Sequence, residues 1–398
     1  MKKLYIIFLA ALVACTGGVN KDRQKLAEEL VQSNILVDGH IDVPYRLSKG
    51  KVDVGVATED GDFDFPRASS GGLNAPFMSI YIPAEKEVEG TAKEYADGLI
   101  DSVEQMVAAH PQKFAIAKNL ENLKEQISQG KISMPLGMEN GAAIDGNLEN
   151  LKHFYDRGVR YITLTHSKSN HISDSSYDKE RPWGGLSDFG EKLIREMNTL
   201  GVMVDVSHIS DEAFWQVIEV SAVPVIASHS SARHFTPDFE RNMSDEMIKA
   251  LANRGGVIMI NFGSTFISAK SRDSSALINA SVDQFMQERN FTEKNEEVKA
   301  YMEALRKEKF VYADLEDVLD HFDHIRSLVG VDHIGIGSDF DGVGDSLPNG
   351  LKDVSAYPNL VFGLLERGYS RDDIKKILGE NVLRVWRINE EYAILQRR

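Results

Sequence analysis

The sequence predicts a single domain of the α/β class, a (β/α)8 barrel of the TIM type. Short apolar segments alternate eight times with segments of helical periodicity, which is typical of parallel βαβ units. Most of the apolar segments also end in a histidine or a carboxylate, as expected where active sites lie at the carboxyl ends of barrel strands. An open doubly wound sheet is the alternative, but no glycine-rich phosphate turn follows the first strand. Strands are predicted at residues 34–43, 77–82, 133–139, 161–166, 202–208, 224–229, 256–262 and 333–339.

The helices are predicted from their periodicity and their end signals, with Ser210 and Ser244 as N-caps. Two stretches break the regular spacing. Residues 48–74 form a long loop rich in Gly and Asp after the first strand, and a charged helical insertion at 282–309 lies between strands seven and eight. The insertion is a candidate lid or subunit contact. Helices are predicted at residues 94–109, 120–129, 148–156, 188–200, 211–220, 245–253, 315–328, 359–366 and 371–385.

The composition excludes some classes of partner. The chain has 398 residues, of which 42% are hydrophobic and 27% are charged, which is ordinary for a globular protein. A chain of this length can bury a large core without disulfides. Its net charge of -16 argues against binding to nucleic acid or to an anionic membrane surface.

The first residues have the pattern of a bacterial lipoprotein signal. Lys2 and Lys3 precede an apolar run at 4–13, which is shorter than the roughly 20 residues of a membrane span. The only cysteine, Cys15, ends the sequence Leu-Val-Ala-Cys, which resembles a lipobox. We expect residues 1–14 to be a signal peptide, 15–29 a tether and 30–398 the barrel. The protein would then be exported and held at the bacterial envelope only by a lipid on Cys15. An ordinary secretory signal with an incidental cysteine is the alternative.

The first predicted strand ends in Asp-Gly-His-Ile-Asp-Val-Pro at residues 38–44. Side chains alternate along a strand, so His40 and Asp42 point the same way and can bind one divalent ion. Pro44 ends the strand, because it cannot donate a ladder hydrogen bond. Taken alone, a His-x-Asp pair is more typical of a core histidine beside a solvated aspartate. The case for a metal therefore depends on the other strands.

Five of the other seven predicted strands also end in residues that bind metals. Histidines and carboxylates in this number exceed what one tetrahedral zinc needs. They suit two metal ions that share a carboxylate, about 3.5–4 Å apart, a centre that hydrolyses carbonyl or phosphoryl groups. Glu139 is the natural bridge, because its strand lies between those of His40 and His208 in the chain. The residues at the strand ends are His40, Asp42, Glu139, His166, His208, His229 and Asp339.

Nine segments of the chain together resemble a known family. They are residues 38–42, 137–139, 162–166, 205–208, 228–232, 241–243, 337–342, 353–360 and 380–385. They resemble the renal dipeptidases, also called membrane dipeptidases, of the amidohydrolase superfamily. The His-x-Asp on strand one is discriminating, because most relatives in that superfamily carry His-x-His there. The resemblance covers residues 30 to 388.

The resemblance implies a zinc-dependent dipeptidase with two Zn²⁺ ions per chain, which hydrolyses free dipeptides through a metal-bridging hydroxide. Asp339 would carry protons, His166 would bind substrate and stabilise the oxyanion, and Arg241 would bind the dipeptide carboxylate. Family members are often dimers, which leaves a homodimer open. The implied zinc ligands are His40, Asp42 and Glu139 for one ion, and Glu139, His208 and His229 for the other.

Some of these residues have rivals in the sequence. Asp341 shares its strand face with Asp339, and Arg233 lies near Arg241, so only the resemblance separates each pair. His234 is a rival of His229, but it does not end a strand.

Three further points stay open on the sequence. Asp205 either orients a ligand or is a buried structural aspartate. Gly263 follows Asn261-Phe262 where vertebrate members have Tyr, so the pocket shape and the preferred dipeptides are not predicted. Another amide or lactam hydrolase on this scaffold is the alternative function, and a surface-binding lipoprotein without catalysis is the alternative of a different class.

Overall fold

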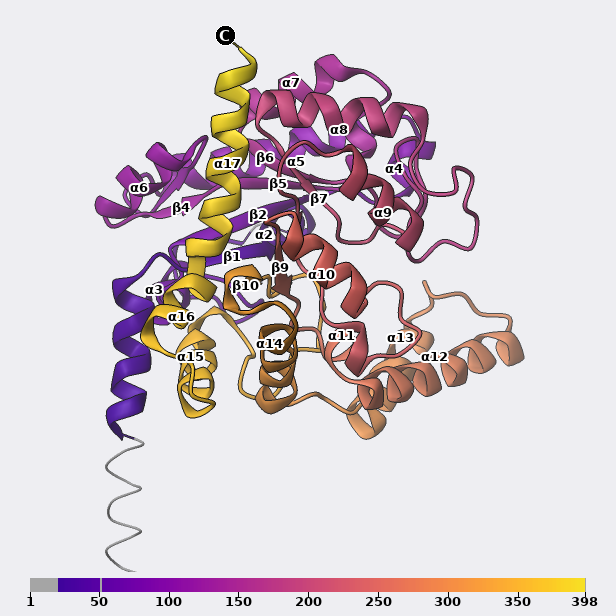
Figure 1. Cartoon of the computed structure of the whole chain (residues 1–398). Helices are drawn as coiled ribbons and strands as arrows, with labels where there is room; N and C mark the ends of the chain where they lie inside the picture. Colours follow the sequence, from indigo (N-terminus) through magenta and orange to yellow (C-terminus); the bar gives the residue numbers. More distant parts are fainter. Residues whose placement is uncertain (1–20, 51, 398) are drawn as a thin grey trace, which may run out of the picture.

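The computed structural model describes residues 21–50 and 52–397, and its centre is a closed barrel of eight parallel strands (Figure 1). The strands neighbour one another in the order β1, β10, β9, β8, β7, β6, β5, β2. The predicted (β/α)8 barrel is thereby confirmed, and the open sheet is excluded. The strands are β1 (Val37–Ile41), β2 (Ala75–Tyr81), β5 (Leu136–Glu139), β6 (Val159–Thr163), β7 (Met203–Asp205), β8 (Ile226–Ala227), β9 (Val257–Ile260) and β10 (Ile334–Ile336).

The predicted third strand is in fact two strands, separated by Pro135. β4 (Ile132–Met134) pairs with β3 (Phe114–Ile116) in a separate two-stranded sheet, and β5 then enters the barrel. Pro135 has no N–H to donate, but its carbonyl accepts from Met78 N at 2.9 Å. The chain can therefore change partners at this residue.

One end of the barrel is closed by apolar side chains. Val37, Met203 and Val257, each the first residue of its strand, belong to one buried cluster with Trp386. Trp386 lies on α17 (Asn381–Gln396), the long yellow C-terminal helix that crosses the direction of the strands in Figure 1. Because the amino ends of the strands are filled in this way, an open site is left to the carboxyl ends.

Most surrounding helices lie where the sequence places them, and three of them coincide with their predicted bounds. Ser210 and Ser244 are N-caps as predicted, since their side chains accept from Ala213 N and Met247 N. The predicted helix at 371–385 is longer and contains a π-helical turn at Lys376–Glu380. The helices are α5 (Ala92–Ala109), α6 (Leu120–Ser128), α7 (Leu148–Arg157), α8 (Asp188–Leu200), α9 (Asp211–Val220), α10 (Asp245–Asn253), α14 (Leu315–Val329), α15 (Tyr357–Glu366), α16 (Arg371–Lys375) and α17.

Several short helices escaped prediction. Pro44 does not simply end the first strand, because it lies in the first turn of α2 (Val43–Lys49). The predicted loop at 48–74 contains α3 (Phe65–Gly71), which also has a proline in its first turn. Two further short helices are α4 (Glu85–Val88) and α11 (Ser264–Ile267).

The helical insertion between the last two barrel strands is present and begins earlier than predicted. It consists of α12 (Ala269–Arg289) and α13 (Glu296–Lys309), which pack as a pair to one side of the barrel (Figure 1). Their facing sides form a small core of their own, which contains Ile278, Val282, Val298, Leu305 and Phe310.

The tether predicted at 15–29 is wrong from residue 21 onward. Residues 21–33 form a helix, and Ala27, Leu30 and Val31 on it are buried in the main core. This apolar spacing fixes one face of the helix to the domain. The predicted signal peptide and Cys15 lie outside the described residues. Among the helices in the described part of the chain, none has the length and apolar character that crossing a membrane requires.

Candidate metal centre and active site

The residues predicted at the strand ends come together at the carboxyl end of the barrel. His40 lies within β1 and Glu139 ends β5. The remaining residues lie just after the carboxyl ends of their strands, namely Asp42, His166, His208, His229 and Asp339. His208 and Asp339 have φ angles of 70° and 64°, in the left-handed region that non-glycine residues seldom adopt. Such strained residues concentrate at functional sites, where the fold holds a side chain in place.

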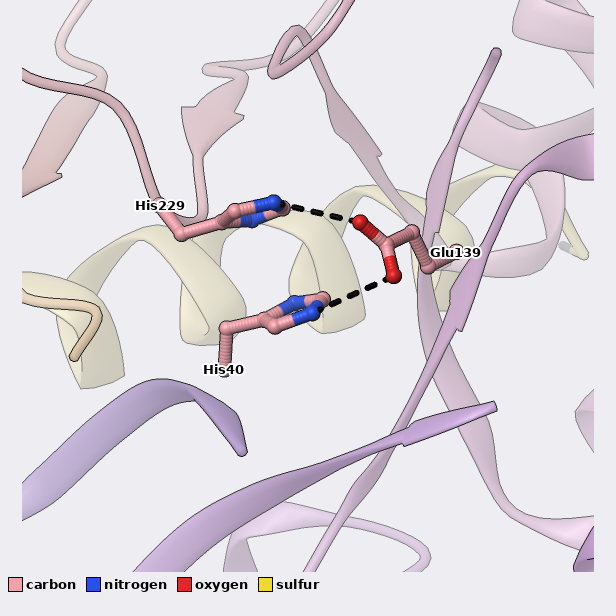
Figure 2. A group of neighbouring side chains, drawn as sticks. All are labelled: His40, Glu139 and His229. Carbon is pink, nitrogen blue, oxygen red and sulfur yellow. Dashed lines mark ion pairs between the residues drawn. The ribbon is translucent and has the colours of Figure 1, made fainter. Parts of the chain in front are cut away.

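Glu139 is the centre of the cluster (Figure 2). Its Oε2 lies 3.4 Å from His40 Nε2, while its Oε1 lies 3.2 Å from His229 Nε2. Oε1 is also 3.1 Å from His208 Nε2. The two oxygens therefore serve different histidines, which is the arrangement a bridging carboxylate needs.

Hydrogen bonds fix the orientation of two of the imidazoles. The Tyr161 hydroxyl donates to Gly39 O at 2.9 Å, so it accepts from His40 Nδ1 at 2.8 Å. His229 Nδ1 lies 2.7 Å from Ser228 Oγ, which in turn donates to Asp205 at 2.6 Å. Because His229 Nδ1 carries a proton, His229 Nε2 keeps a lone pair for a metal ion. Burial lowers the pKa of His40, but Tyr161, Glu139 and Asp42 raise it well above its usual range, so a metal ion would replace the proton on His40 Nε2.

Asp205, left open by the sequence, acts on His229 through Ser228. Its Oδ1 also accepts from the backbone N of Ser228 at 2.7 Å and of Ser207 at 3.1 Å. One buried carboxylate thus holds the segments that follow β7 and β8, which carry His208 and His229. Tyr161 was not found from the sequence, because its partner His40 lies in a distant strand and no local pattern links the two.

The electrostatics of the cluster favour metal-binding protonation states. Burial lowers the pKa of His208 well below its usual range, and the Arg241 guanidinium lowers it further. Burial also lowers the pKa of His229 well below its usual range, and the neighbouring His40 and Arg241 lower it further. Burial opposes ionisation of Glu139, but the neighbouring His40 and His166 hold its pKa well below the usual range. The result is two neutral imidazoles facing an ionised carboxylate, the forms that bind a cation.

These residues fit a metal centre by their chemistry. His40 Nε2 is buried and has no hydrogen-bond partner, which is costly unless a ligand completes it. Ligand atoms lie within 4.8 Å of one another in three overlapping groups: His40, Glu139 and His229; Glu139, His166 and His208; and His40, Asp42 and Asp339. All five predicted zinc ligands fall in this one cluster.

Asp339 and Asp341, which the sequence could not separate, have different surroundings. Asp339 faces the cluster and accepts from Asn261 Nδ2 at 2.8 Å, and burial raises its pKa to about 7. Asp341 lies 3.2 Å from Arg46 and accepts from Asp62 N at 2.7 Å. Only Asp339 therefore has its carboxylate among the candidate ligands.

Gly342 lets two carboxylates approach each other at this point. A Cβ on Gly342 would lie 2.2 Å from both Asp339 Oδ1 and Asp42 Oδ2. Any side chain here would have to displace one of them, so the close approach requires glycine.

Arg241 is buried at the wall formed by His229 and Ser230, and it does not line the main cavity. Its Nη1 donates to Ser230 Oγ at 2.7 Å, and its Nη2 donates to His229 O at 2.7 Å. Its Nε is buried and has no hydrogen-bond partner. The rival Arg233 is paired with Asp211 at 2.6 Å and takes no part in the cluster.

A cavity of about 550 Å³ opens above the cluster. Asp42, Glu139, His166, His208 and Asp339 line its floor and sides. His166 is partly exposed there, with Nε2 3.7 Å from Glu139 Oε1. The lining also includes Asp341 and four aromatic residues that were not predicted, namely Tyr45, Tyr81, Tyr177 and Phe266.

Of these, only Tyr81 had a usable signal, because it ends β2 and so falls under the same strand-end rule as the ligands. The other three lie in helices or loops.

Comparison with known proteins identifies the family. The sequence model of the membrane dipeptidases, peptidase family M19, matches residues 24–397. The chain belongs to this family. An uncharacterised dipeptidase of Schizosaccharomyces pombe is 30% identical to this family member over 98% of its chain and 90% of the yeast protein. The family predicted from the sequence is confirmed, and with it the assignment to metallopeptidases that act as dipeptidases.

Solved structures of a probable dipeptidase and of a metallopeptidase share the fold of this family member. The probable dipeptidase PvdM of Pseudomonas aeruginosa is 28% identical, with a TM-score of 0.81 over 94% of this chain and 100% of that one. A metallopeptidase of Rhodobacter sphaeroides, solved with a phosphinate mimic of the dipeptide L-Ala-D-Ala, is 24% identical, with a TM-score of 0.73 over 89% of this chain and 99% of that one. At the latter identity the likeness concerns the fold.

Removing the Tyr161 hydroxyl should weaken metal binding without touching a ligand. Tyr161→Phe leaves the buried His40 Nδ1 without its acceptor, and such losses cost about 10–100-fold in metal affinity. Competition with a chromophoric chelator measures this affinity. Tyr155→Phe is the control, because the Tyr155 ring stacks on Arg160 away from the cluster. Equal affinities in all three proteins would contradict the orienting role of Tyr161.

Proposed function

We propose that this family member is a zinc-dependent dipeptidase that hydrolyses the peptide bond of free dipeptides. The observation that carries the proposal is Glu139, whose two oxygens face different histidines at the floor of the cavity. His40, Asp42 and Glu139 would hold one Zn²⁺, and Glu139, His208 and His229 the other. When bound, two zinc ions supply an activated water and polarise the substrate carbonyl.

Asp339 and His166 would perform the proton transfer and the charge stabilisation. As water adds to the peptide carbonyl, Asp339 takes its proton and later returns it to the leaving amine, because an amide anion is too poor a leaving group to depart alone. Burial raises the pKa of Asp339, whereas two bound cations would lower it, so the carboxylate would be ionised and able to accept that proton. His166 lines the cavity and would stabilise the oxyanion.

A substrate panel tests the proposal. Free dipeptides should be hydrolysed, while tripeptides, N-acylated amino acids and lactams should be turned over far more slowly. L-Ala-D-Ala belongs in the panel, because a relative of the same fold binds its mimic. Preference for an N-acylated amino acid or a lactam would favour the alternative amidohydrolase activity. Zinc-loaded protein that turns over none of these compounds would favour the binding lipoprotein.

Arg241 would select for the free carboxylate of the dipeptide through Nε, which has no hydrogen-bond partner. Arg241→Ala should lower kcat/KM for a free dipeptide, with a loss of about 2–5 kcal/mol in transition-state stabilisation, as the loss of a desolvated charge partner costs. It should lower kcat/KM little for the dipeptide amide. Metal content must be measured in parallel, because Arg241 also contacts His229. Arg233→Ala is the matched control. Equal penalties for acid and amide would rule out this role for Arg241.

We also propose that the chain is exported and anchored through a lipid on Cys15, on the strength of the signal pattern at residues 1–15. The protein should fractionate with membranes, and Cys15→Ser should release it or block its processing. Mass spectrometry of the mature N-terminus decides the point. An unmodified Cys15 in the mature protein would refute the anchor.

A further inference from the structure

A second group of metal-binding side chains lies near the surface, apart from the cluster in the barrel. His234 lies in the 3-10 turn Arg233–Phe235, Asp245 begins α10, and His324 lies on α14. One ligand atom of each residue lies within 4.8 Å of the others. The helices α10 and α14 pack against each other, so the fold brings together three separate parts of the chain.

Two of the three side chains are held firmly. His324 Nε2 lies 2.7 Å from Asp245 Oδ1, and the His324 side chain is only 15% exposed. The exposed ring of His234 stacks on that of His324, with centroids 4.3 Å apart and planes at 20°. Phe235 packs against both rings from the protein side. The open side faces solvent, where water can complete the coordination of an ion.

The carboxylate of Asp245 has fewer cationic neighbours than that of Asp97. Asp97 also pairs with a histidine, His153, at 2.7 Å, but Lys93 and Arg157 already neutralise it. In the described part of the chain, His324 is the only ion-pair partner of Asp245. Asp245 therefore keeps a negative charge for a cation, and two imidazoles stand beside it.

We infer that His234, Asp245 and His324 form a peripheral site for a divalent transition-metal ion such as Zn²⁺ or Cu²⁺. Two imidazole nitrogens and one carboxylate oxygen are the donors that such ions take, in preference to Mg²⁺ or Ca²⁺. The ion would replace the proton that His324 and Asp245 share. It would also tie the segment after β8 to α14, so it should raise the thermal stability of the protein as its concentration rises.

Copper titration of the full chain loaded with about two Zn²⁺ per chain, enough for the proposed barrel centre alone, tests this site independently of catalysis. Wild-type protein should take up about one additional Cu²⁺ per chain, since Cu²⁺ leads the affinity order for such donors. Electron paramagnetic resonance should show coupling to two imidazole nitrogens. Elemental analysis must show that the zinc stays bound, so that the copper signal does not come from the barrel.

Single substitutions then assign the signal to its residues. His234→Ala and His324→Ala should each remove one nitrogen coupling and weaken Cu²⁺ binding more than about tenfold, because even the loss of a residue that orients a ligand costs that much. His153→Ala, which removes a histidine from the neutralised pair with Asp97, should bind like wild type. Dipeptide hydrolysis should be equal in all four proteins. The same copper uptake and spectrum in His234→Ala and His324→Ala as in wild type would overturn the site, whatever the activity of the enzyme.

Discussion

Asp339→Asn should retain its metals and lose roughly 10²–10⁴ in kcat, the usual contribution of a general acid–base group. Asparagine keeps the size of the side chain and can still accept from Asn261 Nδ2, which lies 2.8 Å from Asp339. It cannot take a proton from water or return one to the amine. The loss should therefore appear in kcat, with metal content and dipeptide binding close to those of wild type.

Asp341→Asn is the matched control for this loss. The side chain of Asp341 is only 3% exposed, but it faces Arg46 and the backbone of Asp62 in the loop after α2. Its substitution should lower the thermal stability and change kcat little. Steady-state kinetics, zinc analysis and thermal unfolding of both variants separate the two roles. If Asp341→Asn is inactive and Asp339→Asn is active with metals bound, the assignment of the catalytic carboxylate is wrong.

Glu139→Ala should abolish dipeptide hydrolysis and remove both metals. The two carboxylate oxygens lie on different sides of the cluster, so their loss takes one ligand from each proposed ion. The histidines are left buried and close together, with His208 Nε2 2.9 Å from His229 Nε2. Zinc content by elemental analysis should fall to a small fraction of the wild-type value.

His166→Asn is the control for Glu139→Ala. His166 faces the cavity and is not a proposed zinc ligand, so this variant should keep its zinc and lose only rate. Full zinc occupancy in Glu139→Ala would disprove the bridge. Loss of zinc in His166→Asn as well would show that His166 belongs among the ligands.

The barrel and the cluster were predictable from the sequence because parallel strands bring their carboxyl ends to one rim. His40, Glu139, His208 and His229 needed only that rule and their residue type, whereas Asp339 was separated from Asp341 by the family resemblance. What the rule does not give is the local path of the chain. β7 ends at Asp205, so His208 does not belong to the strand. His208 itself has a left-handed backbone conformation, which directs its side chain into the site.

Contacts between distant segments escaped prediction for a related reason. The Tyr161 hydroxyl meets His40 across 121 residues, and Asp205 holds His229 through Ser228. Pro135 divides the strand that was predicted as continuous at 133–139, and α3 lies inside the segment 48–74 that was predicted as a loop. In each case tertiary packing, which a single sequence does not reveal, selects among locally acceptable conformations.

The most direct test of a two-zinc dipeptidase is to remove and restore the metal while following hydrolysis of a free dipeptide. Protein stripped by a chelator should be inactive, and activity should return as about two zinc ions per chain are added back, as a two-metal site requires. Circular dichroism before and after stripping checks that the fold is retained. Undiminished hydrolysis by the metal-free protein, or no hydrolysis of any free dipeptide by fully zinc-loaded protein, would contradict the account.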